Sequence, residues 1–240
     1  MTSKKDDKFF FIINLKTYIK GSAANALKLC KICDKLQKTF KHCEIIIAAQ
    51  APDIFRLSRA CKIKIIAQHV DRITPGAHTG KILFYSVKEA GAKGVLINHS
   101  EDQRTLKEIQ ELVNECKKNN LNSIVCAIND KIGQAVAKFA PDFIAIEPPE
   151  LIGTKVSVST ARPNLIKNSV DSIKAINSKI KVLCGAGIHS KRDISKALKL
   201  NADGILVASA IVKAKNPEHK IIQFCETIED FFKKKEKILK

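Results

Sequence analysis

The sequence predicts an α/β protein built as a (β/α)8 barrel, with eight parallel strands and an outer layer of helices. Three observations predict this fold. Eight short runs rich in Ile, Val or Phe recur along the 240 residues, stretches of helical periodicity lie between them, and no linker or low-complexity tract interrupts the series. Barrels of this kind are typically ~250 residues long, so the chain has the length of one such domain.

Each apolar run is too short to be a helix, and its near-continuous hydrophobicity is typical of a parallel strand buried on both faces. In chain order the runs are FFFIIN (9–14), EIIIAA (44–49), IKIIAQ (63–68), GVLIN (94–98), SIVCAI (123–128), DFIAIE (142–147), KVLCG (181–185) and GILVA (204–208). Helical periodicity is present at 25–37, 102–118, 132–139, 164–176 and 191–200. Strands that alternate with helices form right-handed crossovers, and eight such units close a barrel.

The domain organisation follows from the same pattern. We expect residues 1–8 to form a flexible polar tail and residues 9–240 to form a single catalytic barrel domain. No stretch approaches the ~20 apolar residues of a membrane span, and the N-terminal segment does not fit a secretory signal. The sequence therefore predicts a cytoplasmic protein with no membrane partner.

The eight cysteines are scattered along the chain, and without an export signal they are expected to be reduced thiols. Cys30 and Cys33 form a C-x-x-C that, with His42 and Cys43, offers four zinc ligands in principle. Both thiols also have the helical spacing of a buried face, which we favour. We therefore predict no metal, and a zinc assay is the test.

A net charge of +18 is compatible with two kinds of partner. The charge could bind nucleic acid, or it could attract a small anionic substrate. The lysines are spread along the whole chain, and only two tyrosines and no tryptophan are available for base stacking. We predict a small-molecule substrate and no nucleic acid, and keep a catalytically silent basic barrel that binds nucleic acid as an alternative.

The active site of such a barrel forms at the carboxyl ends of its strands, because the loops there converge on the barrel axis. Polar or small residues end five of the predicted strands and are therefore expected to share one mouth. They are Asn14 with Lys16, Asn98 with His99, Glu147, the segment 185–187, and Ala208 with Ser209.

Glu147 is the candidate base. It ends a buried strand and is followed by Pro148 and Pro149, which restrict the backbone around the carboxylate. Restriction suits a group that abstracts a proton, since a misplacement of ~1 Å can cost ~100-fold in rate.

His99 is the candidate electrophile. Ser100 and Gln103 fit a capping box, which predicts a helix that begins just after the histidine. The positive end of that helix would disfavour protonation, so a neutral ring could donate a hydrogen bond to a substrate oxygen. Lys16, just beyond the first strand, could stabilise an oxyanion or a phosphate.

Two loops of small residues, CGAGIHS (184–190) and LVASAIV (206–212), follow adjacent strands. Small side chains let backbone amides approach a phosphate, and barrels often hold a phosphate between the loops after strands seven and eight. The residues so far predict an enzyme that acts on a small phosphorylated substrate.

In this order the residues resemble triosephosphate isomerase in its short, archaeal-type form. The matching segments cover nearly the whole chain: NLKTY (14–18), AQHVD (67–71), PGAHTG (75–80), AGAKGVLINHSE (90–101), IEPPELIGT (146–154), CGAGI (184–188) and LVASAIVKAKNP (206–217). The resemblance implies interconversion of dihydroxyacetone phosphate and D-glyceraldehyde 3-phosphate in glycolysis and gluconeogenesis, without cofactor or metal. The nearest rival is another phosphate-binding barrel enzyme.

The resemblance also implies residue roles. Glu147 would be the base and His99 the electrophile, with Lys16 and Asn14 supporting the substrate oxygens and Glu101 beside the site. The phosphate would rest against Ile152, Gly153, Gly187, Ala208 and Ser209. Residues 151–158 would form a lid that excludes water.

The family pattern implies an oligomer and shows two departures. A homo-oligomer is implied, with a tetramer favoured over a dimer and the segment 75–80 docking into a neighbour. Lys155 stands where the family usually has glycine, which puts the rate of lid movement in question. Ala210 stands where glycine is often found, which could weaken phosphate binding.

Overall fold

The computed structural model describes residues 8–148 and 158–238, and its strands close into a barrel. All neighbouring strands pair in parallel, and β1 pairs with β8 to complete the ring. The strands are β1 (Phe9–Asn14), β2 (Cys43–Ala49), β3 (Lys64–Ala67), β4 (Gly94–Ile97), β5 (Asn122–Ala127), β6 (Phe143–Ile146), β7 (Lys181–Cys184) and β8 (Gly204–Val207). The predicted fold is confirmed, and each predicted strand boundary lies within one residue of the observed one.

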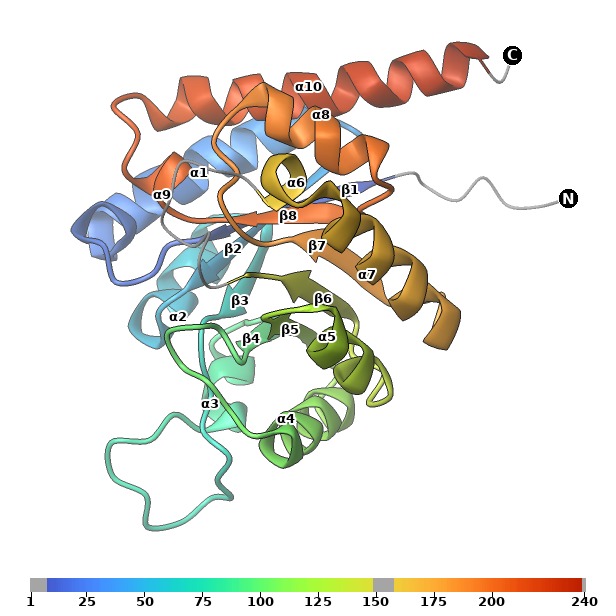
Figure 1. Ribbon diagram of the computed structural model, residues 1–240. Helices are drawn as coiled ribbons and strands as arrows, with labels where there is room; N and C mark the ends of the chain where they lie inside the picture. The colour runs from blue at the N-terminus through green and yellow to red at the C-terminus, as the bar shows by residue number, and fades with distance from the viewer. Residues whose placement is uncertain (1–7, 149–157, 239–240) are drawn as a thin grey trace, which may run out of the picture.

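Helices surround the barrel (Figure 1). They are α1 (Ala23–Thr39), α2 (Ala51–Ala60), α3 (Phe84–Glu89), α4 (Leu106–Lys118), α5 (Asp130–Ala137), α6 (Val158–Ala161), α7 (Pro163–Ile176), α8 (Lys191–Lys199), α9 (Ser209–Val212) and α10 (Pro217–Ile238), with a 3-10 turn η1 (Ile19–Gly21). The short elements η1, α3, α6 and α9 and the longer helices α2 and α10 are not among the stretches for which helical periodicity was predicted. Short helices carry too few turns to show a periodic pattern.

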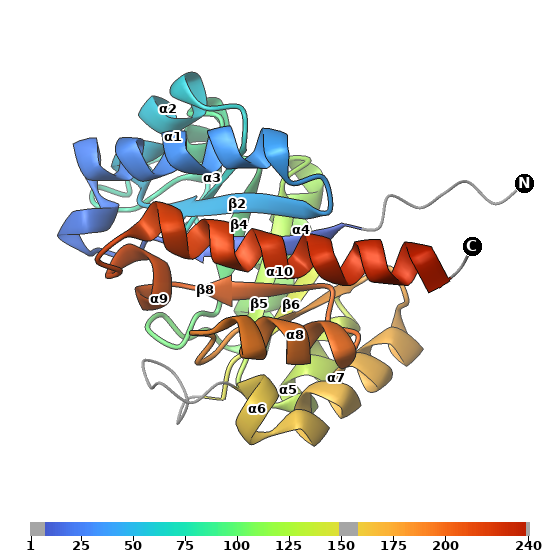
Figure 2. The same cartoon turned by 90° about the horizontal axis from the view of Figure 1, so that it is seen from above.

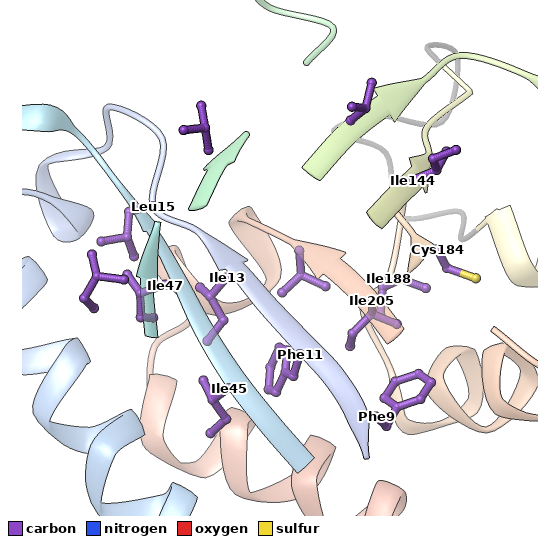
Figure 3. Packing of buried hydrophobic residues seen from close by; sticks show 14 of the residues in the cluster. Phe9, Phe11, Ile13, Leu15, Ile45, Ile47, Ile144, Cys184, Ile188 and Ile205 are labelled. Atoms are coloured by element: carbon purple, nitrogen blue, oxygen red, sulfur yellow. The ribbon is translucent and has the colours of Figure 1, made fainter. Parts of the chain in front are cut away.

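Side chains alternate along each strand between two apolar layers. Phe11 and Ile13 of β1 belong to the layer between strands and helices, which Figure 3 shows together with Ile45 and Ile47 of β2. Ile12 belongs to a second cluster that contains strand residues only, namely Ile12, Ile46, Ala48, Ile66, Leu96, Ile124, Cys126, Phe143, Ala145, Leu183 and Leu206. This second cluster fills the barrel interior, so the barrel is a packed core and supports its mouth from below.

The start of α4 corrects one prediction. The helix begins at Leu106, where Thr105 and Glu108 form the capping box, and not after Ser100. The segment 98–104 is a loop, so His99 does not lie at a helix N-terminus. Both S-x-x-Q and T-x-x-E satisfy the capping pattern, and the pair nearer the apolar helical positions forms the cap.

Acidic side chains are used for structure where the strands begin. The carboxylate of Asp142 accepts hydrogen bonds from the amide (2.8 Å) and hydroxyl (3.0 Å) of Ser123 at the start of β5. Asp203 accepts one from the Val182 amide at 2.8 Å, and Asp34 accepts from two amides just before β3. Each carboxylate satisfies amides that the sheet leaves unpaired, which stabilises the barrel at this end.

Both ends of the described chain lie at the amino-terminal end of the barrel. Figures 1 and 2 show the start of β1 and the end of α10 on the same side of the molecule. Glu236, near the end of α10, lies 3.7 Å from His42, which directly precedes β2. The carboxyl ends of the strands are therefore remote from both ends of the described chain.

Two further predictions can be compared with the described part of the chain. Cys30 and Cys33 are fully buried on α1, and no group of three potential metal-binding side chains is found in residues 8–148 and 158–238. The helices described there include none with the length and apolarity that crossing a membrane requires. Residues 1–7, most of the predicted tail, lie outside the described residues.

Candidate active site

One pocket at the carboxyl ends of the strands gathers most of the predicted site residues. Its lining consists of Asn14, Lys16, Tyr18, His99, Glu147, Leu206, Val207, the β7–α8 residues Gly185, Ala186, Gly187, Ile188 and His189, and Ala208, Ser209 and Ala210. Glu101 lines an adjoining pocket that also includes Asn14, Lys16 and His99. Ile152, Gly153 and Lys155 lie outside the described residues, and Val158, the last residue of the predicted lid, is buried at the start of α6.

Glu147 is a buried carboxylate directly after β6. Its amide donates to the carbonyl of Ala127 at 2.8 Å, which extends the sheet pairing to the base itself. The residue is 3% exposed, and among the described residues its Oε2 has no hydrogen-bond partner. Burial raises the pKa of Glu147 to about 7, against the opposing effects of a hydrogen bond from the Cys126 thiol and the charge of Lys16. The carboxylate can therefore both accept and return a proton near neutral pH.

Gly185 makes room for this carboxylate. A Cβ at Gly185 would lie 2.3 Å from Cγ of Glu147, far inside van der Waals contact. The amide of Gly185 donates to the carbonyl of Ile146 at 3.0 Å, so the backbone on which that Cβ would stand is fixed. Glycine at this position is required by space and not by an unusual backbone angle.

His99 is buried, lines the same pocket as the base and is held as a neutral ring. The amide of Glu101 donates to Nδ1 of His99 at 3.2 Å, so Nδ1 acts as an acceptor and the ring proton is on Nε2. Burial lowers the pKa of His99, and the charge of Lys16 lowers it further, while Glu101 and Asp102 oppose the shift. The predicted neutral state is therefore supported by burial and a backbone amide, and not by the helix that the sequence suggested.

Lys16 adopts an unusual backbone conformation, with a φ of 49°. Three contacts hold it there: its amide donates to Oδ1 of Asn14 at 3.0 Å, its carbonyl accepts from Gln68 at 3.1 Å, and its ammonium lies 2.8 Å from Glu101. A non-glycine residue in the left-handed region costs of order 1–3 kcal/mol and persists only where its surroundings impose it. The strain fixes the direction in which the ammonium leaves the first strand.

The loops after β7 and β8 contribute small residues to the same pocket. Gly187 has a φ of 67°, a conformation that favours glycine. Ala208 precedes α9 and Ser209 begins it, so the first amides of this helix have no partner within the helix. Ala210 also lines the pocket, which places the departure from the family pattern next to these amides.

Comparison with known proteins agrees with this geometry. The family model described as triosephosphate isomerase matches residues 9–229. The chain belongs to the triosephosphate isomerase family.

Three archaeal members of the triosephosphate isomerase family illustrate the similarity. The protein of that name from Methanobrevibacter smithii is 46% identical over 211 residues, which cover 88% of this chain and 95% of the relative. Those from Methanothermus fervidus and Methanocaldococcus jannaschii are each 43% identical, over 210 and 217 residues. These cover 88% and 90% of this chain and 94% and 99% of the relatives.

The sequence reasoning missed three residues of the site. Tyr18 lines the pocket, and its ring lies 4.4 Å from the ammonium of Lys213. Cys126 contacts the base from inside the barrel, and His189, two residues after Gly187, also lines the pocket. Tyr18 stands within the NLKTY segment that resembles triosephosphate isomerase, so that motif could have indicated it. No sequence motif indicates Cys126, because in the sequence it is one of several apolar residues in a predicted strand.

Proposed function

We propose that this chain interconverts dihydroxyacetone phosphate and D-glyceraldehyde 3-phosphate, with Glu147 as the base and His99 as the electrophile. The observation that carries the assignment of roles is the shared pocket of a buried carboxylate, a neutral imidazole and a lysine. Membership of the triosephosphate isomerase family supports the substrate and the reaction, in glycolysis and gluconeogenesis. It also disfavours the rival barrel enzymes.

The reaction begins with a proton transfer from carbon. Glu147 removes a proton from the carbon that carries the hydroxyl group and is bonded to the carbonyl carbon. The electron pair of that C–H bond forms the C=C bond of an enediolate. His99 donates from Nε2 to the substrate oxygen on which negative charge develops, and the Lys16 ammonium stabilises the same charge. Nε2 of His99 gives its proton to the former carbonyl oxygen and takes up the proton of the neighbouring hydroxyl oxygen, which becomes the new carbonyl oxygen. Protonated Glu147 returns its proton to the adjacent carbon, so atoms and electrons balance without an external carrier.

Asn14 and Glu101 support this machinery. Asn14 accepts from the Lys16 amide, and Glu101 both contacts the Lys16 ammonium and fixes Nδ1 of His99 through its amide. We assign the phosphate to the amides around Gly187, Ala208 and Ser209, with Ile152 and Gly153 completing that site. The net charge of +18 raises the local concentration of such an anionic substrate.

A coupled assay with glyceraldehyde 3-phosphate, with phosphoglycolate as competitor, tests the proposal. Glu147→Gln should lower turnover by about 10²- to 10⁴-fold, because the amide cannot accept the proton. Glu115→Gln is the matched control, since Glu115 is half-buried on α4, outside the pocket, and its side chain pairs with Lys118 alone in the described residues. Full turnover in the Glu147 variant would reject its role as the base.

We also propose that the chain forms a homo-oligomer in the cytoplasm, with a tetramer favoured over a dimer. The segment between β3 and α3 projects away from the barrel (Figure 1), and residues 74–81 are all exposed. A projecting arm of this kind supports docking into a neighbouring copy. Light scattering at assay concentration tests this proposal, and a monomer would contradict it.

A further inference from the structure

All eight cysteines are buried free thiols, and five of them lie together away from the candidate active site. Cys43 begins β2, and Cys225 lies in the middle of α10. Their sulfur atoms are 3.5 Å apart, and neither residue has any exposed surface. Cys33 of α1 is the next thiol to this pair, and Cys30 interacts with Cys61 at the end of α2.

The distance between the two sulfurs suits bond formation. A disulfide needs about 2.05 Å between sulfurs, so the pair must close by only about 1.5 Å, which small side-chain rotations can supply. The two residues belong to elements that already pack together, since α10 contacts β2 and runs alongside it in Figure 2. The bond would join positions 182 residues apart in the chain.

Burial protects this pair while α10 is docked. Burial raises the pKa of Cys43 well above its usual range, and the hydrogen bond with Cys225 and the charge of Glu229 act in the same direction. A thiol that is protonated and shielded from solvent reacts slowly with oxidants. Reaction therefore requires α10 to be away from the barrel, either during folding or in a local opening of this last helix.

We propose that Cys43 and Cys225 form a reversible disulfide that fastens α10 to the barrel. The oxidant is a small disulfide such as oxidised glutathione. The thiolate of one cysteine attacks the small disulfide and releases one thiol, leaving a mixed disulfide on the protein. The second cysteine then attacks the protein sulfur and releases the second thiol, so two electrons and two protons pass from the protein to the oxidant.

The bond should change stability and not catalysis. Cys43 is at the start of β2, whereas the candidate active site lies at the opposite end of the strands. Closing a loop of this length restricts the unfolded chain, and the restriction stabilises the fold in the chain-entropy description of disulfides. The oxidised protein should therefore melt at a higher temperature and turn over triose phosphates as before.

Refolding in a redox buffer tests the proposal without requiring access to the buried pair. The chain is unfolded in urea and refolded in a glutathione buffer with excess oxidised form. It is then quenched with acid, unfolded again, alkylated with iodoacetamide so that the buried free thiols also react, and mapped by mass spectrometry without reduction. We expect one peptide pair joining Cys43 to Cys225, with the other six thiols alkylated. The melting temperature should rise by about 5–15 °C, return on reduction with dithiothreitol, and leave turnover within about twofold.

Two variants complete the experiment. Cys43→Ala should show neither the linked peptide nor the shift in melting temperature. Cys116→Ala, which removes a buried thiol on α4 outside this group, should keep both. The peptide map of the unaltered chain decides the question even where the Cys43 variant does not refold. Eight alkylated thiols at equilibrium, or a linked peptide of Cys30 and Cys61 in place of the expected one, would overturn the proposal.

Discussion

The two ends of the barrel use acidic side chains in opposite ways. Where the strands begin, Asp142 and Asp203 each accept hydrogen bonds from strand amides at 2.8 Å. Where the strands end, Glu147 is buried with one carboxylate oxygen unpartnered among the described residues. Lys16 at the same end has a φ of 49°. The first end lowers the free energy of the fold, whereas the second holds groups in states that cost free energy and that catalysis can use.

Two glycines, one at each end of the barrel, give the most direct test of whether the two ends differ in function. A Cβ at Gly185 would lie 2.3 Å from Cγ of Glu147, and a Cβ at Gly204 would lie 2.3 Å from the carbonyl oxygen of Phe10. Gly185→Ala should lower kcat/KM by about 100-fold, because the base is displaced by roughly 1 Å.

Gly204→Ala is the matched control for Gly185→Ala. It should lower the melting temperature by about 5–10 °C, since overpacking costs roughly 1–3 kcal/mol. Its activity at 25 °C should stay within about twofold. Equal losses of activity in the two variants would show that the ends are not separate in function.

Glu147→Gln should stabilise the protein at alkaline pH. The pKa of Glu147 is raised from 4.5 to about 7, so below 4.5 the folded and unfolded states are both protonated and no free energy is lost. Stability is lost as pH rises from 4.5 to about 7, to an extent of about 3 kcal/mol at most. The variant should therefore melt roughly 5 °C above the unaltered protein at pH 8.5.

The same two proteins should melt together at pH 4, and thermal denaturation followed by circular dichroism checks both conditions. A difference in melting temperature that does not change with pH would contradict the raised pKa.

Asp142→Ala tests the end where the strands begin. The substitution leaves the amide of the fully buried Ser123 without its acceptor, which should cost about 1–2 kcal/mol. Urea denaturation should show the loss, while kcat/KM stays within about twofold. A large loss of activity with unchanged stability would show that the end where the strands begin serves catalysis and not stability.

Cys126→Ala is expected to have the smallest effect. The Cys126 thiol lowers the pKa of Glu147, so its removal should raise that pKa and leave less carboxylate in the ionised form. We expect kcat/KM to fall about two- to fivefold at pH 6.5, with the difference disappearing by pH 9. Cys184→Ala is the control, because Cys184 is a buried thiol whose pKa is raised by burial alone and not by Glu147. A loss that is equal at all pH values would indicate a packing defect.

The strands could be predicted within one residue because parallel strands buried on both faces leave an unbroken apolar run. The same rule gave Glu147 its position, since the acid follows the last buried residue of β6. The start of α4 was misplaced because two capping patterns, one beginning at Ser100 and one at Thr105, compete in the same segment, and only packing decides between them. Cys126 could not be found, because its contact with Glu147 depends on the register of β5 against β6. Ile152 and Gly153 remain predictions.

The positions of Lys8 and Ile238 have a practical consequence. Because β1 begins and α10 finishes at the same pole, opposite the pocket, anything attached through either would extend away from the substrate entrance. Tethering to a bead, a surface or a second enzyme can therefore leave diffusion of the triose unobstructed.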